Sequence, residues 1–530
     1  MNEERTTLRP AGHTLAQSLI ATGATHAWCV PGESYLGLMD GLRDAPGFRL
    51  VTCRHEGGAG FMALAEARLT GKPGLLMVSR GPGAGNATIA AHVAQQDGVP
   101  LILIIGQVPR DMRNRSAFQE VDYARTFQDM AKAVIEVNEP SRIAEFAAQA
   151  WHTAQAGRPG LVVLSLPEDV LLAEIAAPPQ SAQNPRRPGP SAEDLDAVHK
   201  LLSQAKRPLL LAGEALSSQA GRSALLELAD AWNLPVLCGH KHQDLFPNRH
   251  PGWAGHIGHV VPKAQAGLWA QADLILAAGT LLGEIDTQGY RFPSFPRAQQ
   301  RLVQIHHDPL ALARHYQPDL AVCADPAALL SQLARLSPAP AQEGWRTHLH
   351  DLAAPPTPQT AYQRVLAEID RKAPQDAIFT MDSGTFASST HRFLGVGGAR
   401  LMVGTASGAM GNGAPAAVAA AILHAGRTVI AIVGDGGLLM TGNELATAQL
   451  EAAPIRILVP NNASYGAIAG HQDRIFPGRR HATDLVNPDF AKWAESFGAL
   501  GLRIGPQTDI AEAVDRFLTH PGHVLLEVAS

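Results

Sequence analysis

Residues 429–437 read VIAIVGDGG, and this stretch decides the choice of fold. The five apolar residues at its start predict a buried strand of a parallel sheet. The Gly-Asp-Gly turn that follows lets the backbone bend sharply and bring N–H groups close to an anion. Asp435 within the turn supplies a carboxylate oxygen, which is a ligand that Mg²⁺ prefers. The stretch therefore predicts an anion and metal site at the end of a strand.

A second apolar strand, residues 455–459, leads into Asn461 and Asn462 after a spacing of 24 residues (437–460). Gly-Asp-Gly alone is common in ordinary turns, and Asn-Asn alone is common in loops. The spacing and the two strands favour a functional interpretation, because open α/β folds bind ligands at the carboxyl ends of their strands. We therefore expect a metal–diphosphate site there.

The composition limits the class of protein. With 530 residues the chain exceeds the usual size of one domain, which predicts two to three domains. Hydrophobic residues at 46% and charged residues at 17% suit a well-packed α/β enzyme, and the net charge of −5 argues against nucleic acid and acidic membranes as partners. Four scattered cysteines indicate neither a disulfide framework nor a zinc site. Residues 1–5 lack the apolar core of a signal peptide, so we expect a cytoplasmic protein.

Two Pro-rich stretches, Ala176–Pro190 and 337–358, divide the chain into blocks at 1–175, 192–335 and 358–530. Each block alternates short apolar strands with helical stretches, which predicts an α/β fold of three doubly wound parallel sheets. The expected strands are 27–30, 50–53, 75–78, 101–105, 161–164, 209–212, 274–277, 302–305, 378–381, 429–433, 456–459 and 524–528.

The first block carries a second group of motifs. Glu56 stands where a strand ends and a helix of small residues begins, and the segment 81–86 (GPGAGN) opens the next helix. A lone Glu in this position is more often a helix cap that complements the helix dipole.

The two groups of motifs together resemble those of thiamine diphosphate enzymes. The resemblance implies a pyrimidine-binding domain (1–175), a central domain (192–335) and a diphosphate-binding domain (358–530). It makes Glu56 the catalytic residue, whose carboxyl exchanges a proton with the aminopyrimidine ring, while the carbanion chemistry belongs to the cofactor.

The resemblance also implies the remaining cofactor contacts. The Mg²⁺ ligands are Asp435, Asn462 and the backbone carbonyl of Ser464. Met410 is the apolar wedge that bends the cofactor, although an ordinary core methionine is the alternative. The other expected contacts are Pro31, Asn86, Gly384, Gly408, Gly436, Gly437, Tyr465 and Gly466.

Within the family, the segments 106–109 (GQVP), 117–122 (AFQEVD) and 443–447 (NELAT) are similar to the acetolactate synthase branch. Phe118 and Gln119 are then expected at the substrate. Three segments depart from that branch: Pro31–Ser34 replaces Pro-Gly-Gly, His471 stands in place of a tryptophan, and Leu282–Asp286 replaces a flavin-binding stretch. FAD binding is therefore doubtful.

Four arginines lie near the expected substrate residues: Arg80, Arg110, Arg113 and Arg115. One interpretation is a solvated basic loop. The other is that Arg80 or a loop arginine pairs with a carboxylate of the substrate, as guanidinium geometry favours.

The sequence thus predicts a thiamine diphosphate- and Mg²⁺-dependent carboligase that decarboxylates a 2-keto acid, as acetolactate synthase does. A lyase or decarboxylase that acts on another keto acid or diketone is the alternative. A non-enzymatic alternative is a vestigial or regulatory cofactor-binding protein. The resemblance implies at least a homodimer, because the amino-terminal domain of one subunit faces the carboxyl-terminal domain of another.

Overall fold

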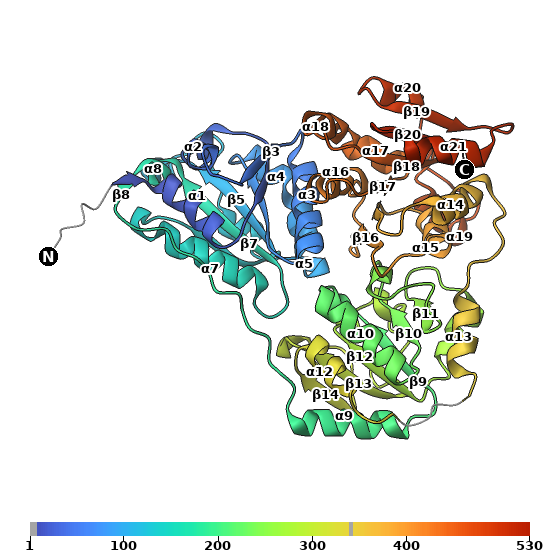
Figure 1. Ribbon diagram of the computed structural model, residues 1–530. Coiled ribbons are helices and arrows are strands. Elements are labelled where there is room, and N and C mark those ends of the chain that lie inside the picture. Colours follow the sequence, from blue (N-terminus) through green and yellow to red (C-terminus); the bar gives the residue numbers. More distant parts are fainter. Residues whose placement is uncertain (1–7, 339–342, 530) are drawn as a thin grey trace. The chain divides into compact units, whose positions relative to one another are not determined.

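The computed structural model describes residues 8–338 and 343–529 (Figure 1). These residues form three six-stranded parallel sheets with helices packed on them, which confirms the predicted α/β fold. No helix in the described ranges is long and apolar enough to cross a membrane. Residues 1–5, and residues 339–342 of the second Pro-rich stretch, lie outside the described residues.

The first sheet has the strand order β3-β2-β4-β5-β7-β6. The order reverses between β2 and β4, so the loops that follow these two strands diverge from one point of the sheet edge. Such a switch point is where open α/β sheets bind ligands. The strands are β2 (His26–Cys29), β3 (Arg49–Thr52), β4 (Gly74–Val78), β5 (Leu101–Gln107), β6 (Ala131–Glu136) and β7 (Leu161–Pro167).

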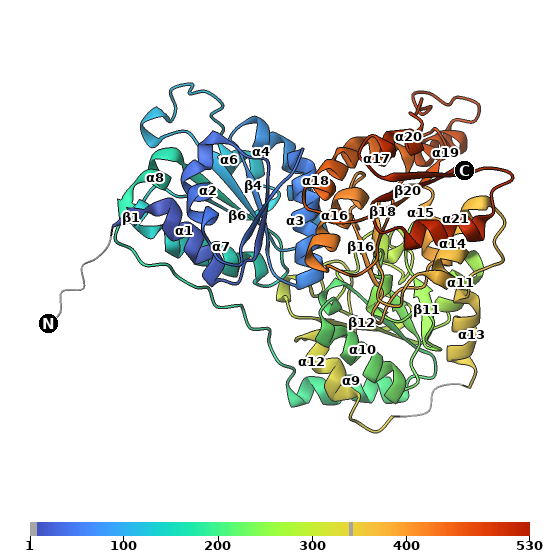
Figure 2. The ribbon, with the colours of Figure 1, turned by 45° about the horizontal axis from the view of Figure 1, so that its top comes forward.

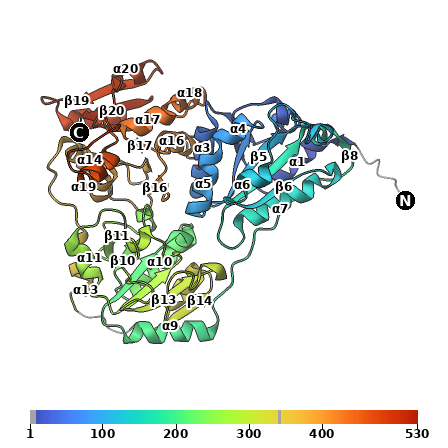
Figure 3. The same ribbon diagram turned by 180° about the vertical axis from the view of Figure 1, so that it is seen from behind.

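Helices cover both faces of the first sheet (Figures 2 and 3). Leu75 and Met77 of β4 pack with α1 (Ala11–Ala21) and α7 (Ile143–Gln155) in one core cluster. Leu76, between them in sequence, points to the other face, where α3 and α5 pack. The other elements are α2 (Leu36–Arg43), α3 (Glu56–Thr70), α4 (Pro82–Asn86), α5 (Thr88–Asp97), α6 (Tyr123–Phe127) and α8 (Glu168–Leu172), with β1 (Arg9–Pro10) paired to β8 (Glu174–Ile175).

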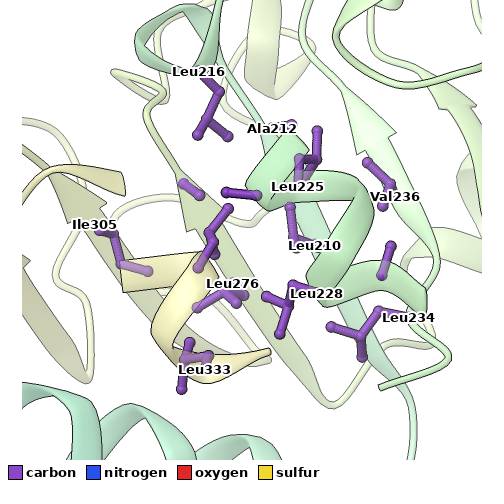
Figure 4. Close-up of a cluster of buried hydrophobic side chains, with 14 of the residues drawn as sticks. Leu210, Ala212, Leu216, Leu225, Leu228, Leu234, Val236, Leu276, Ile305 and Leu333 are labelled. Atoms are coloured by element: carbon purple, nitrogen blue, oxygen red, sulfur yellow. The ribbon is translucent and has the colours of Figure 1, made fainter. Parts of the chain in front are cut away.

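The central sheet has the order β11-β10-β9-β12-β13-β14. Leu225 and Leu228 of α10 (Gln219–Ala231) pack onto Leu210 and Leu276 of its inner strands (Figure 4). Helix α13 (Trp345–Ala353) lies beside β11, as Figure 3 shows. The other elements are α9 (Ala192–Gln204), β9 (Pro208–Ala212), β10 (Val236–Cys238), β11 (Trp253–His256), α11 (Lys263–Trp269), β12 (Leu274–Ala278), β13 (Arg301–His306), β14 (Leu320–Cys323) and α12 (Pro326–Leu333).

The third sheet has the order β16-β15-β17-β18-β20-β19. The Gly-Asp-Gly turn follows β17, and Asn461 ends β18, as the sequence predicted. The elements are α14 (Ala361–Lys372), β15 (Ile378–Met381), α15 (Ala387–Phe393), β16 (Leu401–Gly404), α16 (Gly413–Leu423), β17 (Val429–Ile432), α17 (Asp435–Thr441), α18 (Leu445–Leu450), β18 (Arg456–Asn461), α19 (Gly466–Ile475), α20 (Phe490–Glu495), β19 (Leu500–Ile504), α21 (Ile510–Thr519) and β20 (Val524–Ala529).

By internal contacts the chain falls into two compact units. Unit 1 contains residues 1–185, 405–457 and 495–499, and unit 2 contains the rest. The first Pro-rich stretch has neither helix nor strand up to Pro190. Most of its residues are exposed, although Ala177 and Ala182 pack against the core of the first sheet. The three predicted domain limits stay a prediction.

Candidate active site

Glu56 is the first residue of α3, as the sequence predicted. His55 caps the helix, because its Nδ1 accepts a hydrogen bond of 2.9 Å from the Gly57 N–H. Asn86 donates from Nδ2 to Glu56 Oε2 at 2.9 Å. A Cβ atom at Gly83 would lie only 3.3 Å from Glu56 Oε1, so glycine leaves room for the carboxylate. The GPGAGN segment and Glu56 are thus brought together.

The loops after β2 and β4 meet at the switch point of the first sheet. Gly32, next to Pro31, approaches Ser79 so closely that an added Cβ would lie 2.6 Å from Ser79 Cβ. Ser34 Oγ lies 3.1 Å from Ser79 Oγ and accepts from the Arg80 N–H at 3.3 Å. These contacts fix the loop that carries Pro31 against the loop that carries Arg80.

Three predicted substrate residues, Arg80, Phe118 and Gln119, lie together in unit 1. Arg80 Nε donates to the Phe118 carbonyl at 3.2 Å, and an added Cβ at Gly81 would lie 2.9 Å from Gln119 Cβ. Phe118 is 73% exposed, whereas Arg80 is only 8% exposed. The loop therefore presents its aromatic ring outward while it holds the guanidinium in place.

The guanidinium of Arg80 borders a pocket of about 420 Å³ in unit 1. It pairs with Glu168, and it lies 3.8 Å from the carboxylate of Glu33. Two carboxylates and one guanidinium therefore meet at the pocket, and two exposed leucines, Leu36 and Leu172, form part of its apolar side. The complete lining is Glu33, Ser34, Leu36, Gly37, Arg80, Glu168, Leu171 and Leu172.

The other arginines of the loop have a different environment. Arg110 pairs with Asp169 at 2.7 Å, and Arg113 pairs with Glu120 and with Glu136, each at 3.1 Å. Arg115 is exposed and donates to a backbone carbonyl. Arg110 and Arg113 form salt bridges away from the pocket, whereas Arg80 is the one of these four arginines that lines it.

The loop of Met410 is held by its backbone conformation and by a hydrogen bond from α17. Gly408 and Gly411 have φ values of +78° and +90°, which favour glycine. Thr441 Oγ1 at the end of α17 donates to the Gly411 carbonyl at 2.6 Å. The half-buried Met410 is thus tied to the helix that begins with Asp435. Gly436 and Gly437 follow Asp435 as buried residues of that helix.

The segment after β18 is held by a neighbouring loop of unit 2. Asn462 Oδ1 accepts from the Ser464 N–H at 3.2 Å, and the Tyr465 N–H donates to the Thr483 carbonyl at 2.8 Å. An added Cβ at Gly466 would lie 2.7 Å from Asn462 Nδ2, so glycine leaves room for the amide. Asn462, Ser464, Tyr465 and Gly466 therefore lie together.

Two further predicted residues lie elsewhere in unit 2. Gly384 follows a segment clamped by Lys241, whose Nζ donates to the Asp382 carbonyl and to Ser383 Oγ, each at 3.0 Å. His471 is exposed on α19 and contacts Arg474.

The donors of the predicted metal site fit Mg²⁺ chemically. Asp435, Asn462 and Ser464 offer a carboxylate, an amide oxygen and a backbone carbonyl, which are all hard oxygen ligands. Asp435 is 3% exposed and opens α17 directly after β17. Across the described residues, no cluster of three or more His, Cys, Asp or Glu side chains competes as a metal site. The assembly of the pyrimidine and diphosphate halves stays a prediction.

Sequence reasoning missed several carboxylates that support these groups, namely Glu33, Asp97, Glu168 and Glu444. Glu444 was noted only as part of a family-like segment, and Asp97 was not noted. Glu444 follows Gly442 and Asn443 in a mixed stretch, so no local pattern marks it as a buried carboxylate. Asp97 precedes Gly98 at a helix end, where an acidic residue is unremarkable in sequence.

The chain matches models of known protein families along most of its length. Residues 9–126 match the model of the thiamine pyrophosphate enzyme N-terminal TPP binding domain. Residues 195–333 match the central domain of the same enzymes, and residues 382–528 match their C-terminal TPP binding domain.

Individual relatives are similar over nearly their full length. Acetolactate synthase isozyme 1 large subunit of Escherichia coli is 29% identical over 510 residues, which covers 94% of this chain and 90% of the relative. Acetolactate synthase of Mycobacterium bovis is 28% identical over 524 residues, which covers 94% of this chain and 84% of the relative. The acetolactate synthase large subunit of Corynebacterium glutamicum is also 28% identical, which covers 95% of this chain and 83% of the relative. The chain belongs to the thiamine pyrophosphate enzymes, in the acetolactate synthase-like group, and is a thiamine diphosphate-dependent enzyme of the lyase or transferase type.

Proposed function

We propose that the protein decarboxylates a 2-keto acid and joins the remaining acyl carbons to a second carbonyl compound, releasing CO₂ and a 2-hydroxy ketone. When bound, thiamine diphosphate supplies the carbanion chemistry of this reaction. The observation that carries the proposal is the placement of Glu56 at the start of α3, held by Asn86 beside Gly83.

Each predicted residue has a definite task in this proposal. Glu56 exchanges a proton with the pyrimidine ring nitrogen, and Asn86 orients its carboxylate by binding Oε2. Asp435, Asn462 and the Ser464 carbonyl would hold Mg²⁺, whose charge would balance that of the diphosphate. The glycines at 436 and 437 let the backbone approach the diphosphate closely. Met410 would support the cofactor from the loop at 408–411.

Arg80 is proposed to bind the carboxylate of the 2-keto acid. Its guanidinium has more N–H groups than its contacts to Phe118 and Glu168 use, and it borders the pocket. Glu168 holds the guanidinium in place and reduces its net positive charge. A substrate with one carboxylate suits this balance better than a dicarboxylate, because Glu33 repels a second negative group.

Acetolactate as the product is the first specific proposal, supported by the names of the relatives. A second candidate is a lyase or decarboxylase that acts on a different keto acid or diketone. It is favoured by Glu33, which lines the pocket where the synthases carry glycine, and by His471 where they carry tryptophan. Both residues change the side chains expected around the second carbonyl substrate.

The test is incubation of the Mg²⁺ and thiamine diphosphate holoenzyme with a panel of 2-keto acids and diketones. CO₂ release with formation of acetolactate from pyruvate supports the first candidate. Cleavage of a diketone, or decarboxylation to a free aldehyde, supports the second. Absence of any turnover with bound cofactor supports the vestigial alternative.

The smallest active unit is proposed to be a homodimer, in which Glu56 and Asp435 of one site come from different subunits. The cytoplasmic location expected from the sequence is part of this proposal.

A further inference from the structure

Glu444 is a fully buried carboxylate that lies in unit 1 against the segment preceding Glu56. Its Oε1 accepts from the Arg54 N–H at 3.1 Å and from the His55 N–H at 3.0 Å. Its Oε2 accepts from the Arg54 N–H at 3.2 Å and from Thr447 Oγ1 at 2.6 Å. The side chain therefore ties the last turn of α17 and its 3₁₀ extension (Gly442–Glu444) to the start of α3.

The packing around Glu444 leaves it little freedom. A Cβ atom at Gly58 would lie 2.4 Å from Oε1, so this glycine, two residues after Glu56, makes room for the carboxylate. Helix α16 packs against α3 in the same unit. Burial raises the pKa of Glu444, while the hydrogen bonds from Thr447, Arg54 and His55 oppose that shift. A carboxylate without such donors is costly to bury, so the contacts form as a set.

A second buried carboxylate, Asp97, makes similar contacts. Here the acidic residue belongs to the amino-terminal segment and the backbone N–H groups belong to residues 406 and 407. The Asp97 carboxylate accepts from the Ala406 N–H at 2.8 Å and from the Ser407 N–H at 2.7 Å. Arg68 pairs with it at 2.5 Å. Residues 406 and 407 precede Gly408 and Met410, just as residues 54 and 55 precede Glu56. In each case a buried carboxylate binds backbone N–H groups that lie shortly before a predicted cofactor contact. Glu444 does so before Glu56, and Asp97 does so before Gly408 and Met410.

We propose that Glu444 is a positioning residue for Glu56, which it holds in place through the backbone N–H groups of residues 54 and 55. This inference rests on the proposed role of Glu56 in proton exchange. Proton transfer requires a hydrogen-bond distance, and a displacement of about 1 Å can lower the rate by roughly 10². Glutamate is required because four hydrogen bonds converge on its two oxygens. Glutamine at this position turns an acceptor into an NH₂ donor that faces N–H or O–H groups.

The test compares Glu444→Gln holoenzyme with a matched control, Glu451→Gln, whose side chain bonds to Arg49 on β3. For Glu444→Gln we expect kcat to fall about tenfold or more, with KM for the 2-keto acid changed less than threefold. The kcat–pH profile shifts, because the environment of Glu56 changes. Amide hydrogen exchange at residues 54 and 55, followed by mass spectrometry, becomes at least tenfold faster. Glu451→Gln keeps the wild-type values.

Two further variants separate this inference from the proposed function. If Glu56→Gln keeps wild-type turnover, the proposed function fails. If Glu56→Gln loses turnover while Glu444→Gln keeps the wild-type kcat, pH profile and amide exchange, this inference is overturned. The inference is also overturned if Glu444→Gln lowers the melting temperature but the kcat–pH profile of the folded enzyme stays unchanged. That result shows that Glu444 has only a structural role. If Glu444→Gln fails to fold, Thr447→Val takes its place, because it removes one hydrogen-bond donor to Glu444. Thr447→Val is expected to shift the kcat–pH profile in the same direction. A wild-type profile for this variant overturns the inference.

Discussion

Arg80 combines two properties that rarely occur together, because it is almost fully buried and yet faces a pocket. Its pairing with Glu168 means that a substrate carboxylate meets a guanidinium already held in one orientation. Little side-chain entropy is then lost on binding. This arrangement distinguishes Arg80 from Arg110 and Arg113, which the sequence alone left equivalent to it.

Arg80→Ala is expected to lower kcat/KM for a carboxylate-bearing donor by about tenfold to a hundredfold, because a charged hydrogen bond is worth about 1.5–3 kcal/mol. An uncharged diketone is expected to be affected less than threefold. Steady-state kinetics on both donors measure the difference. Arg110→Ala, which breaks the pair with Asp169, serves as the control and should affect neither donor strongly. Equal losses on both donors contradict the carboxylate role.

Sequence reasoning found the residues with a distinctive local setting and missed those defined by long-range contacts. Glu56 was found because the order of strand, His-Glu, helix and Gly-Pro-Gly around it resembles a family motif. Glu444 accepts from N–H groups 389 and 390 residues away in the chain, and no local pattern announces such a contact. Glu168 was missed for the same reason, since its link to Arg80 spans 88 residues.

At the scale of elements, burial decides which strands a sequence reveals. The interior strands β4, β5 and β7 are buried along their whole length, and their apolar runs were predicted within a few residues of their ends. The edge strand β6 has only partly buried or exposed residues, so its composition is mixed and it was missed. The edge strands β11, β14, β16 and β19 were missed as well. Interior β10 was also missed, because it has only three residues.

Gly60→Ala is expected to lower the stability of unit 1 by about 1–3 kcal/mol through overpacking. The added Cβ lies 2.4 Å from Ala90 Cβ, so α3 and α5 must move apart. Thermal unfolding should show a melting temperature lower by a few degrees. Gly85→Ala is the matched control, since no atom lies within 4 Å of its added Cβ. An unchanged melting temperature for Gly60→Ala contradicts the close helix packing.

At the scale of the whole molecule, we expect a cluster of histidines in unit 2 to limit stability in acid. The rings of His256 and His391 lie 5.1 Å apart, and His240 lies 6.2 Å from His391. Loss of hydration lowers the pKa of His256 to about 4, and nearby Arg392 adds to the shift. Burial also lowers the pKa of His240 and His391, with Lys241 and the neighbouring rings opposing protonation further.

These histidines are neutral in the folded state and protonate more readily when unfolded. Above pH 6.5, the ordinary pKa of histidine, these residues do not oppose folding. The free energy of unfolding decreases as the pH falls from 6.5 toward 4, because the unfolded chain then binds more protons than the folded chain. For His256 alone the loss is about 2–3 kcal/mol, at about 1.4 kcal/mol per pKa unit. The melting temperature should fall over this range, and His256→Gln should make the fall shallower. An identical slope for the variant excludes His256 as a cause.

A mixture of two inactive variants tests whether the active site is shared between subunits. Glu56→Gln and Asp435→Ala are each expected to abolish turnover as homodimers. Co-expressed heterodimers contain one site with both native residues, so about one quarter of the wild-type activity should return if subunits assemble at random. Separately purified variants that are mixed without exchange provide the control. No recovery in verified heterodimers indicates that each site lies within one chain.

The contacts of Glu444 also affect the order in which the chain can mature during synthesis. The strands of the first sheet are complete at Pro167, but Glu444 leaves the ribosome 277 residues later (444 − 167). At about 5–20 residues per second, this delay is on the order of tens of seconds. During that time the N–H groups of Arg54 and His55 lack their acceptor, and the start of α3 is not yet fixed. A nascent chain halted before residue 405 therefore contains all strands of the first sheet but lacks the carboxylate that positions the segment before Glu56.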